Sequence, residues 1–206
     1  MAQIFGGVSP PSNTSYADGT SALALQGKAG ELVATELHGK WYTAAYRGRV
    51  FTGNTAAAGT TIPVSSATAA TFTLYNPLGS GVNVELISSD VSILNATTVV
   101  SSIALGVISG LIVSPTSVTA LTTYPTLIGG SAVAQAKLYS VATLATAATL
   151  FIPLFSVSAT SGAFPNFHYD FDGKLILAPG SLVHLVGTAA QTSASMNGFT
   201  WAEWPL

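Results

Sequence analysis

The side chains best suited to chemistry gather near residue 170. His168, Asp170 and Asp172 fall at every second position, so a strand would place all three on one face. With His184 they could ligate a metal ion, because imidazole and carboxylate groups are common metal ligands. Only one His-x-Asp sequence is present, however, and no second histidine or glutamate follows at the interval of a complete motif. Asp172-Gly173 is a standard turn pair, so we predict a solvated strand that leads into a turn.

Elsewhere the sequence lacks the patterns that catalysis requires. Gly-x-Ser-x-Gly is missing, and the glycine-rich segments 79–81 and 129–130 have no following lysine and helix to bind a phosphate. There is no cysteine to supply a thiolate ligand or a disulfide. We therefore predict a protein that is not an enzyme and that holds no metal or cofactor. A cupin-like metalloenzyme, built on His168, Asp170 and His184 in a jelly roll, is the weakest alternative.

Charged side chains make up only 7% of the 206 residues, against about 25% in ordinary globular domains. Positions 91–136 contain none at all, and the hydroxyl groups of Ser and Thr supply the polarity instead. β-Branched Thr, Val and Ile favour pleated sheets, so the composition predicts an all-β protein. The net charge of −2 and the six scattered Lys and Arg residues provide no basic surface for nucleic acid, and we predict that the protein binds none.

Residues 94–113 form an apolar stretch long enough to be considered as a membrane-spanning helix. They include Asn, Thr and Ser side chains, and neither end carries a Lys, an Arg or a belt of aromatic residues. Two buried strands that meet near Gly106 or Gly110 explain the segment better, so we predict no contact with a membrane. The first residues lack the basic and apolar regions of a secretory signal, which predicts that the protein is made in the cytoplasm.

The first 30 residues differ from the rest. They combine turn-forming Gly, Pro, Asn and Asp residues and follow neither the strand period nor the helix period. We interpret residues 1–30 as an extended N-terminal arm and residues 31–206 as one domain. Ile4, Phe5, Leu23 and Leu25 would be the apolar hooks through which the arm orders on a neighbouring subunit or shell protein.

From residue 31 onward, strand patterns recur at short intervals. The clearest hairpin joins segments 71–75 and 82–87, which alternate in polarity and flank a turn-rich sequence. Pro153 cannot donate a ladder hydrogen bond, which indicates an edge strand or a bulge. The other predicted strands are 41–51, 136–141, 150–157, 174–177, 182–186 and 196–204. About ten short strands without a convincing helix predict an antiparallel β-sandwich of jelly-roll type.

Five aromatic residues near the two ends of this domain could mark a surface: Trp41, Tyr42, Tyr46, Trp201 and Trp204. Aromatic faces pack on sugar rings, so these residues could form a sugar-stacking platform. Trp and Tyr also serve as core or interface anchors, because each joins a large apolar body to one polar group. We favour the second interpretation and predict an interface, with one tryptophan of the closing pair packed inward and the other against a neighbour.

Three segments together carry a family resemblance. They are residues 39–51, the strand Phe72-Thr73-Leu74-Tyr75-Asn76-Pro77 with its Gly-Ser-Gly turn and its Val-Asn-Val-Glu-Leu continuation, and the closing Trp201-Ala202-Glu203-Trp204-Pro205-Leu206. In style and order they resemble small virion proteins of tailed bacteriophages, of the head decoration (cement) type. The resemblance covers residues 31–206 and rests on no diagnostic motif. It implies a β-sandwich trimer seated on a capsid lattice, without active-site residues.

The resemblance and the composition together predict a non-enzymatic virion structural protein that decorates and stabilises a bacteriophage capsid. Its partners would be sister subunits, in a homotrimer, and the major capsid protein of the shell. Its place would be the capsid surface. The main alternative is a receptor- or carbohydrate-binding module of a phage tail or head fibre. The copy number per virion separates these two, because a shell holds far more copies than a tail.

Overall fold

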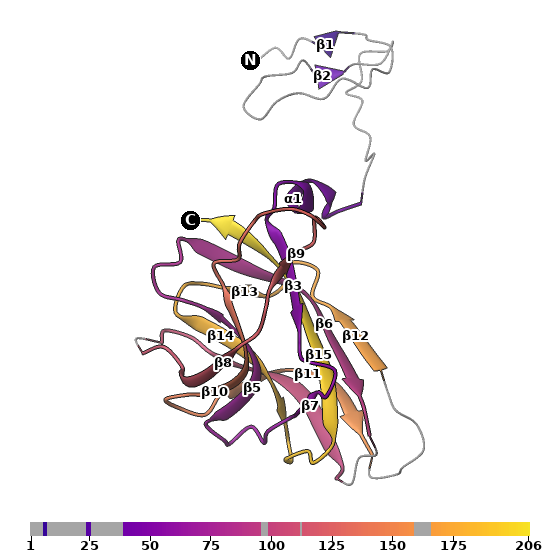
Figure 1. Ribbon diagram of the computed structural model, residues 1–206, viewed down its shortest axis with the longest axis vertical. Coiled ribbons are helices and arrows are strands. Elements are labelled where there is room, and N and C mark those ends of the chain that lie inside the picture. Colours follow the sequence, from indigo (N-terminus) through magenta and orange to yellow (C-terminus); the bar gives the residue numbers. More distant parts are fainter. Residues whose placement is uncertain (1–5, 8–23, 26–38, 96–98, 112, 159–165) are drawn as a thin grey trace. The chain divides into compact units, whose positions relative to one another are not determined.

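The computed structural model describes residues 6–7, 24–25, 39–95, 99–111, 113–158 and 166–206 (Figure 1). The chain divides into two units, Met1–Lys40 and Trp41–Leu206. In the first unit, β1 (Gly6–Gly7) pairs in parallel with β2 (Ala24–Leu25). The predicted arm, residues 1–30, falls within this unit. The second unit contains the helix and the remaining strands.

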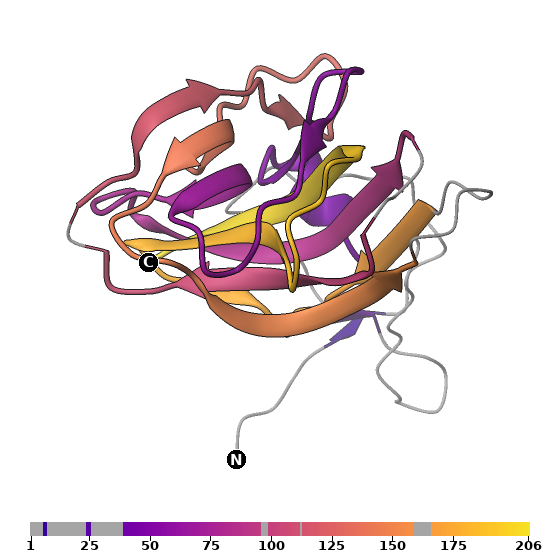
Figure 2. The same cartoon turned by 90° about the horizontal axis from the view of Figure 1, so that it is seen from below.

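The second unit is a sandwich of two antiparallel sheets, seen in two views in Figure 1 and Figure 2. The six-stranded sheet has the order β11-β7-β14-β5-β10-β8. Its strands are β5 (Ala69–Asn76), β7 (Ser101–Ile108), β8 (Thr116–Ala120), β10 (Lys137–Thr143), β11 (Thr149–Val157) and β14 (Ser181–Gly187).

The seven-stranded sheet has the order β12-β6-β15-β3-β9, with β13 paired to β6 and β4 paired to β15. Its strands are β3 (Val50–Asn54), β4 (Thr60–Thr61), β6 (Val82–Ile93), β9 (Tyr124–Pro125), β12 (Asn166–Asp170), β13 (Ile176–Leu177) and β15 (Ala194–Pro205). The predicted all-β antiparallel sandwich is confirmed. Its jelly-roll topology is not confirmed.

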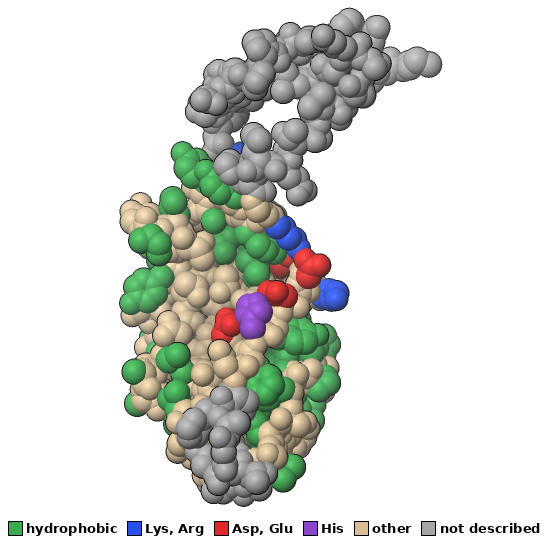
Figure 3. Space-filling view, turned by 90° about the vertical axis from the view of Figure 1, so that its right-hand side faces the viewer, with side chains coloured by type: hydrophobic (Ala, Val, Ile, Leu, Met, Phe, Trp, Pro, Cys, Tyr) green, Lys and Arg blue, Asp and Glu red, His purple; other side chains and the backbone are tan. Residues whose placement is uncertain are grey.

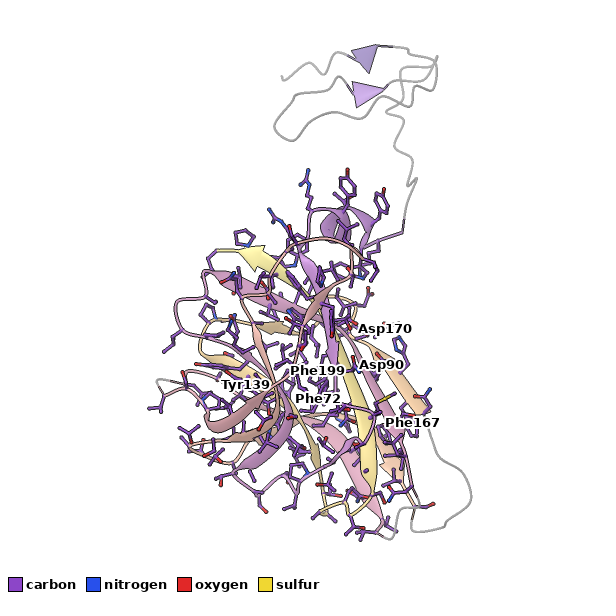
Figure 4. All side chains as sticks on the ribbon, viewed as in Figure 1. Phe72, Asp90, Tyr139, Phe167, Asp170 and Phe199 are labelled. Atoms are coloured by element: carbon purple, nitrogen blue, oxygen red, sulfur yellow. The ribbon has the colours of Figure 1, made fainter. Side chains whose placement is uncertain are left out.

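The main core fills the space between the two sheets, because each strand turns alternate side chains inward. Phe72 of β5 meets Phe199 of β15 with 4.6 Å between ring centroids, and both are labelled in the middle of Figure 4. Phe51 and Trp201 pack with their centroids 6.2 Å apart, and all four side chains are buried. Burial of one such side chain contributes about 1.5–3 kcal/mol, so this layer is a main source of stability.

The predicted hairpin of segments 71–75 and 82–87 is wrong in its pairing. Both segments are strands, but β5 lies in the six-stranded sheet and β6 in the seven-stranded sheet. Residues 77–81 therefore carry the chain from one sheet to the other, with Gly79 and Gly81 at positive φ angles of 76° and 73°. An alternating pattern marks one buried face per strand. It looks the same whether two consecutive strands share a sheet or face each other across the core.

A second crossing lies beside the first. β13 ends at Leu177 and β14 starts at Ser181, again in opposite sheets. The buried Asn76 joins the two crossings, since its Nδ2 donates to the carbonyl oxygens of Val82 and Leu177 at 2.9 Å each. The backbone carbonyl of Asn76 also accepts the N–H of Gly180 at 2.8 Å. These bonds supply partners for backbone groups at the points where the strands leave their sheets. They are needed because a buried backbone N–H or carbonyl without a hydrogen-bond partner is unfavourable.

The predicted strand at 41–51 is wrong in its first half, where the chain forms the helix α1 (Tyr42–Tyr46). Gly48, with a φ of 68°, follows the helix, and glycine adopts this conformation without strain. One side of the helix is buried: Ala44 packs with Val50, Ile87 and Ala202. A five-residue helix is too short to display a helical period in the sequence, which explains the error.

The other strand predictions are confirmed with shifted ends. β11 is an edge strand, and its register shifts beside Pro153, as a residue without an N–H group requires. Gly106 lies inside the single strand β7, which corrects the prediction of two buried strands in segment 94–113, and the next strand, β8, is exposed. Among the residues described, no helix is both long and apolar enough to cross a membrane.

Candidate functional site

The polar strand face predicted around His168 is present on β12, an edge strand of the seven-stranded sheet. His168 lies opposite Asp90 of β6. Its Nδ1 is 2.6 Å from Oδ1 of Asp90, and its Nε2 is 3.1 Å from Oδ1 of Asp170. In Figure 3 a histidine side chain (purple) lies between acidic side chains (red) on this face. All three side chains are at least half exposed, so the prediction of a solvated strand is confirmed.

The hydrogen bond with Asp90 raises the pKa of His168. Slight burial of the ring opposes the shift, and the negative charges of Asp90 and Asp170 add to it. Exposure to water weakens each of these contacts. The chemical result is an imidazole that stays protonated to a higher pH than usual and that fixes the orientation of the Asp90 carboxylate.

The other members of the considered metal site lie elsewhere. Asp172 and Gly173 form the centre of a tight turn with φ angles of 50° and 79°, closed by the N–H of Lys174 donating to the carbonyl of Phe171 at 3.0 Å. Two positive φ angles are typical of a type I′ turn, and the predicted turn is confirmed. His184 lies in β14, in the opposite sheet. The described ranges contain no group of three His or acidic side chains arranged to hold a metal ion.

His184 is buried on the outer face of the six-stranded sheet, because its neighbours along β14 point into the main core. It lies opposite Thr73 on one side and Gly106 on the other. A Cβ at Gly106 would approach Nε2 of His184 to 3.2 Å and Cβ of Ala148 to 3.0 Å, so this glycine makes room for the ring. Among the described residues, neither ring nitrogen makes a hydrogen bond of good geometry. Burial lowers the pKa of His184 to about 4, and a backbone hydrogen-bonding contact with Leu185 opposes this shift only in part.

The two tryptophans of the closing segment have different surroundings. Trp201 is fully buried in the main core and has no surface to offer a partner, so the prediction that one of the pair packs inward is confirmed. Trp204 is only partly buried. Its Nε1 donates to Oε2 of Glu85 at 2.7 Å, and the guanidinium carbon of Arg49 lies 5.8 Å from its ring centroid.

Glu203, between these tryptophans, is a buried carboxylate that holds a loop. Its Oε2 accepts the backbone N–H of Gln135 at 2.9 Å, and its Oε1 accepts that of Ala136 at 2.9 Å. Oε1 also accepts the indole N–H of Trp201 at 3.1 Å. Three donors thus converge on one side chain, and the segment before β10 is attached to the centre of the other sheet.

The remaining aromatic predictions concern α1. Tyr42 and Tyr46 are 47% and 66% exposed, and their rings stack with centroids 6.1 Å apart. Trp41 is partly buried beside them. Trp201 is thus set apart from the others in the main core, whereas Trp41 and Trp204 both pack against the cluster of Ala44, Val50, Ile87 and Ala202 at α1. Of the predicted arm hooks, the structure places Leu25 in β2, while Ile4, Phe5 and Leu23 lie outside the described residues.

Sequence reasoning missed a polar hollow on the outer face of the seven-stranded sheet. The hollow measures about 340 Å³, and its lining residues are Thr52, Asn54, Asp90, Ser92, Asn166, Met196, Asn197 and Gly198. They come from the neighbouring strands β3, β15, β6 and β12. The one sequence signal for this hollow is Gly198, because a glycine inside a strand often marks a place where another group comes close.

Sequence reasoning indicated an edge or a bulge at Pro153 but missed that this edge exposes apolar side chains. β11 is the outermost strand of the six-stranded sheet, and its residues Leu150 and Phe151 are 46% and 53% exposed. The strand contains no charged residue. Free edge strands usually carry charges that prevent them from pairing with other chains. Instead of charges, β11 has Pro153 and two register shifts, between Leu150 and Ile152 and between Pro153 and Phe155, which interrupt the edge without making it polar.

Comparisons with known proteins provide no family for this chain: no family model, no curated protein and no solved structure matches it. The functional conclusion therefore depends on the surfaces and the geometry described above.

Proposed function

We propose that this protein is a non-enzymatic structural component of a bacteriophage virion, which decorates the capsid and stabilises it. In this proposal the protein is made in the host cytoplasm, forms a homotrimer and attaches to the major capsid protein at the capsid surface. The resemblance of three sequence segments to head decoration proteins supports the proposal. The two exposed edges of the six-stranded sheet also support it.

The observation that carries the proposal is the uncharged edge formed by β11. Leu150 and Phe151 expose apolar surface there, beside backbone groups that pair with no strand of the described residues on the outer side. Such an edge promotes association unless a neighbour covers it. A protein that works as an isolated monomer would gain nothing from keeping it open.

The opposite edge of the same sheet supports a ring of subunits. It is formed by β8, Thr116–Ala120, in which all five residues are exposed and none is charged. A sheet with two different free edges favours contacts between unlike surfaces, β11 of one subunit against β8 of the next. Contacts of this head-to-tail kind close into rings when the rotation between subunits permits, and a trimer is the smallest such ring.

Phe151→Lys tests the role of this edge. A lysine at an assembled interface loses its water without gaining a partner, which costs about 3 kcal/mol and weakens association roughly 100-fold. We expect the unchanged protein to be a trimer by light scattering at micromolar concentration and the variant to be a monomer with an intact circular dichroism spectrum. Ile176→Lys is the matched control, because Ile176 is 59% exposed but lies in the other sheet. A monomeric unchanged protein, or a variant that still forms trimers, would contradict the proposed interface.

The proposed position of this protein on the capsid surface is tested by measuring the number of copies per virion. Purified particles separated on a calibrated gel should contain this chain in numbers comparable to the trimer positions of a shell. A count of only a few tens would favour the tail- or head-fibre alternative and would leave the trimer prediction intact.

A further inference from the structure

The polar hollow on the seven-stranded sheet is built from rows of side chains that the sheet register sets side by side. One row contains Asn54, Gly198, Asp90 and His168, on four neighbouring strands. The next row contains Met196, Ser92 and Asn166. The side chain that is missing from the first row, at Gly198, leaves the depression between Asn54 and Asp90.

Gly198 is needed for space and not for backbone conformation. It does not belong to the glycines with positive φ, so any residue could adopt its backbone geometry. A Cβ at this position would meet Cβ of Asp90 at 3.5 Å and Oδ2 of Asp90 at 3.8 Å, which are ordinary contacts. The strand would accept a side chain here, and glycine in a strand interior is unfavourable. The hollow is therefore a feature that the fold itself does not require.

The groups around the hollow are fixed in place but keep free hydrogen-bonding capacity. His168 holds Oδ1 of Asp90, while Oδ2 faces the space above Gly198. The Nδ2 of Asn54 donates to the carbonyl of Thr55, which leaves its Oδ1 as an acceptor. Within the described part of the chain, the side chains of Ser92 and Asn166 have no hydrogen-bond partner. The hollow thus offers both donors and acceptors.

The same lining excludes several ligand classes. No Lys or Arg lines the hollow, and the carboxylate of Asp90 repels anions, so phosphates and acidic sugars do not fit. A single carboxylate among neutral groups is too little for a divalent cation, which prefers six or more oxygen ligands. Apolar compounds would leave the amide and carboxylate groups without partners. A neutral ligand with several hydroxyl groups satisfies the set.

We propose that this hollow binds a neutral saccharide. Hydroxyl groups of the sugar donate to Oδ2 of Asp90 and exchange hydrogen bonds with Asn54, Ser92 and Asn166. Met196, which is 40% exposed, contacts the C–H face of the ring. The volume lies at the lower end of the range for small-molecule sites, which suits one or two sugar units bound weakly. This site differs from the aromatic platform considered from the sequence, and it does not depend on the capsid role.

The test uses the full chain, four neutral sugars (glucose, galactose, N-acetylglucosamine and N-acetylgalactosamine) and two-dimensional NMR of the backbone amides. At least one sugar should shift the amide signals around Gly198 and Asp90 with a Kd on the order of millimolar. Gly198→Thr fills the hollow and should weaken that binding at least about tenfold while the thermal unfolding temperature is kept or raised. If the threonine variant does not fold, Gly198→Ala serves the same purpose, since its Cβ makes only ordinary contacts.

Two carboxylate variants separate binding from general effects of charge. Asp90→Asn should weaken binding as Gly198→Thr does, because it removes the charged acceptor in the hollow. Asp170→Asn is the control, because it also removes a carboxylate beside His168 but lies outside the lining; it should bind the sugar as the unchanged protein does. The proposal is overturned if no sugar shifts these signals, if glucuronic acid or calcium ions alone bind as well, or if Gly198→Thr binds normally.

Discussion

Acidification from about pH 7 to about pH 4 is expected to lower the free energy of unfolding by about 3 kcal/mol through His184 alone. The pKa of this buried ring falls from an ordinary value of 6.5 to about 4. Between these values the unfolded chain binds a proton that the folded chain does not bind, so stability decreases as the pH decreases. The stabilising effect of the neutral ring is complete above pH 6.5 and is lost by the time the pH has passed through the folded pKa.

The variant His184→Leu should remove this loss, because it places an apolar side chain of similar size in the site and leaves no group there to protonate. Urea unfolding at several pH values between about 7 and 4 measures the difference. His168→Gln is the matched control. The pKa of His168 is raised, so its contribution is present at low pH and is lost only as the pH rises through the raised value. If acidification lowers the free energy of unfolding of His184→Leu as much as that of the unchanged protein, groups other than His184 cause the effect.

Replacing Glu203 by alanine is expected to cost about 3–5 kcal/mol of folding free energy. The reason is the convergence of two backbone N–H groups and one indole N–H on its carboxylate. Without it, two buried donors and one partly buried donor lose their acceptor at once. The free energy of unfolding of Glu203→Gln should lie between those of the unchanged protein and the alanine variant. One carbonyl oxygen cannot accept from all three donors, and the new NH₂ group faces one of them. Chemical denaturation measures both variants.

Glu85→Gln is the control for this experiment. Glu85 receives one indole N–H, that of Trp204, at a partly buried position, and an amide oxygen can accept that bond. Its cost should therefore be below about 1 kcal/mol. Hydrogen exchange adds a local test, because the amides of Gln135 and Ala136 should lose protection first in the Glu203 variants. Equal costs at positions 85 and 203 would show that the loop is held by other contacts.

The strands could be predicted from the sequence because alternation and turn chemistry are local properties. The edge position of β11 followed from the missing N–H of Pro153, and the turn at Asp172-Gly173 followed from the conformations that these residues tolerate. Pairing is not local. The sequence between β5 and β6 looks like a hairpin turn, yet Asn76 and the glycines of the connection direct the two strands into different sheets.

The candidate site was partly predictable for the same reason. His168 and Asp170 share a strand face by their spacing, whereas Asp90 reaches His168 only through a pairing between distant strands. The hollow above Gly198 joins four strands, and no segment of the sequence contains enough of it to be recognised. His184 appeared as a possible ligand because a sequence shows the residue type and does not show that the ring is buried without a partner.

The place of β15 has a consequence for synthesis. This strand is the last of the sandwich along the chain, yet it lies between β6 and β3 and supplies Phe199 and Trp201 to the main core. Thr52 and Phe199 are hydrogen-bonded across 147 positions, which a ribosome spans in roughly 7–30 s. During that time β3, and β6 once it has been made, lack their shared neighbour. The seven-stranded sheet can close only after β15 has emerged from the ribosome, so the cell must keep the uncharged strands made before it from aggregating until then.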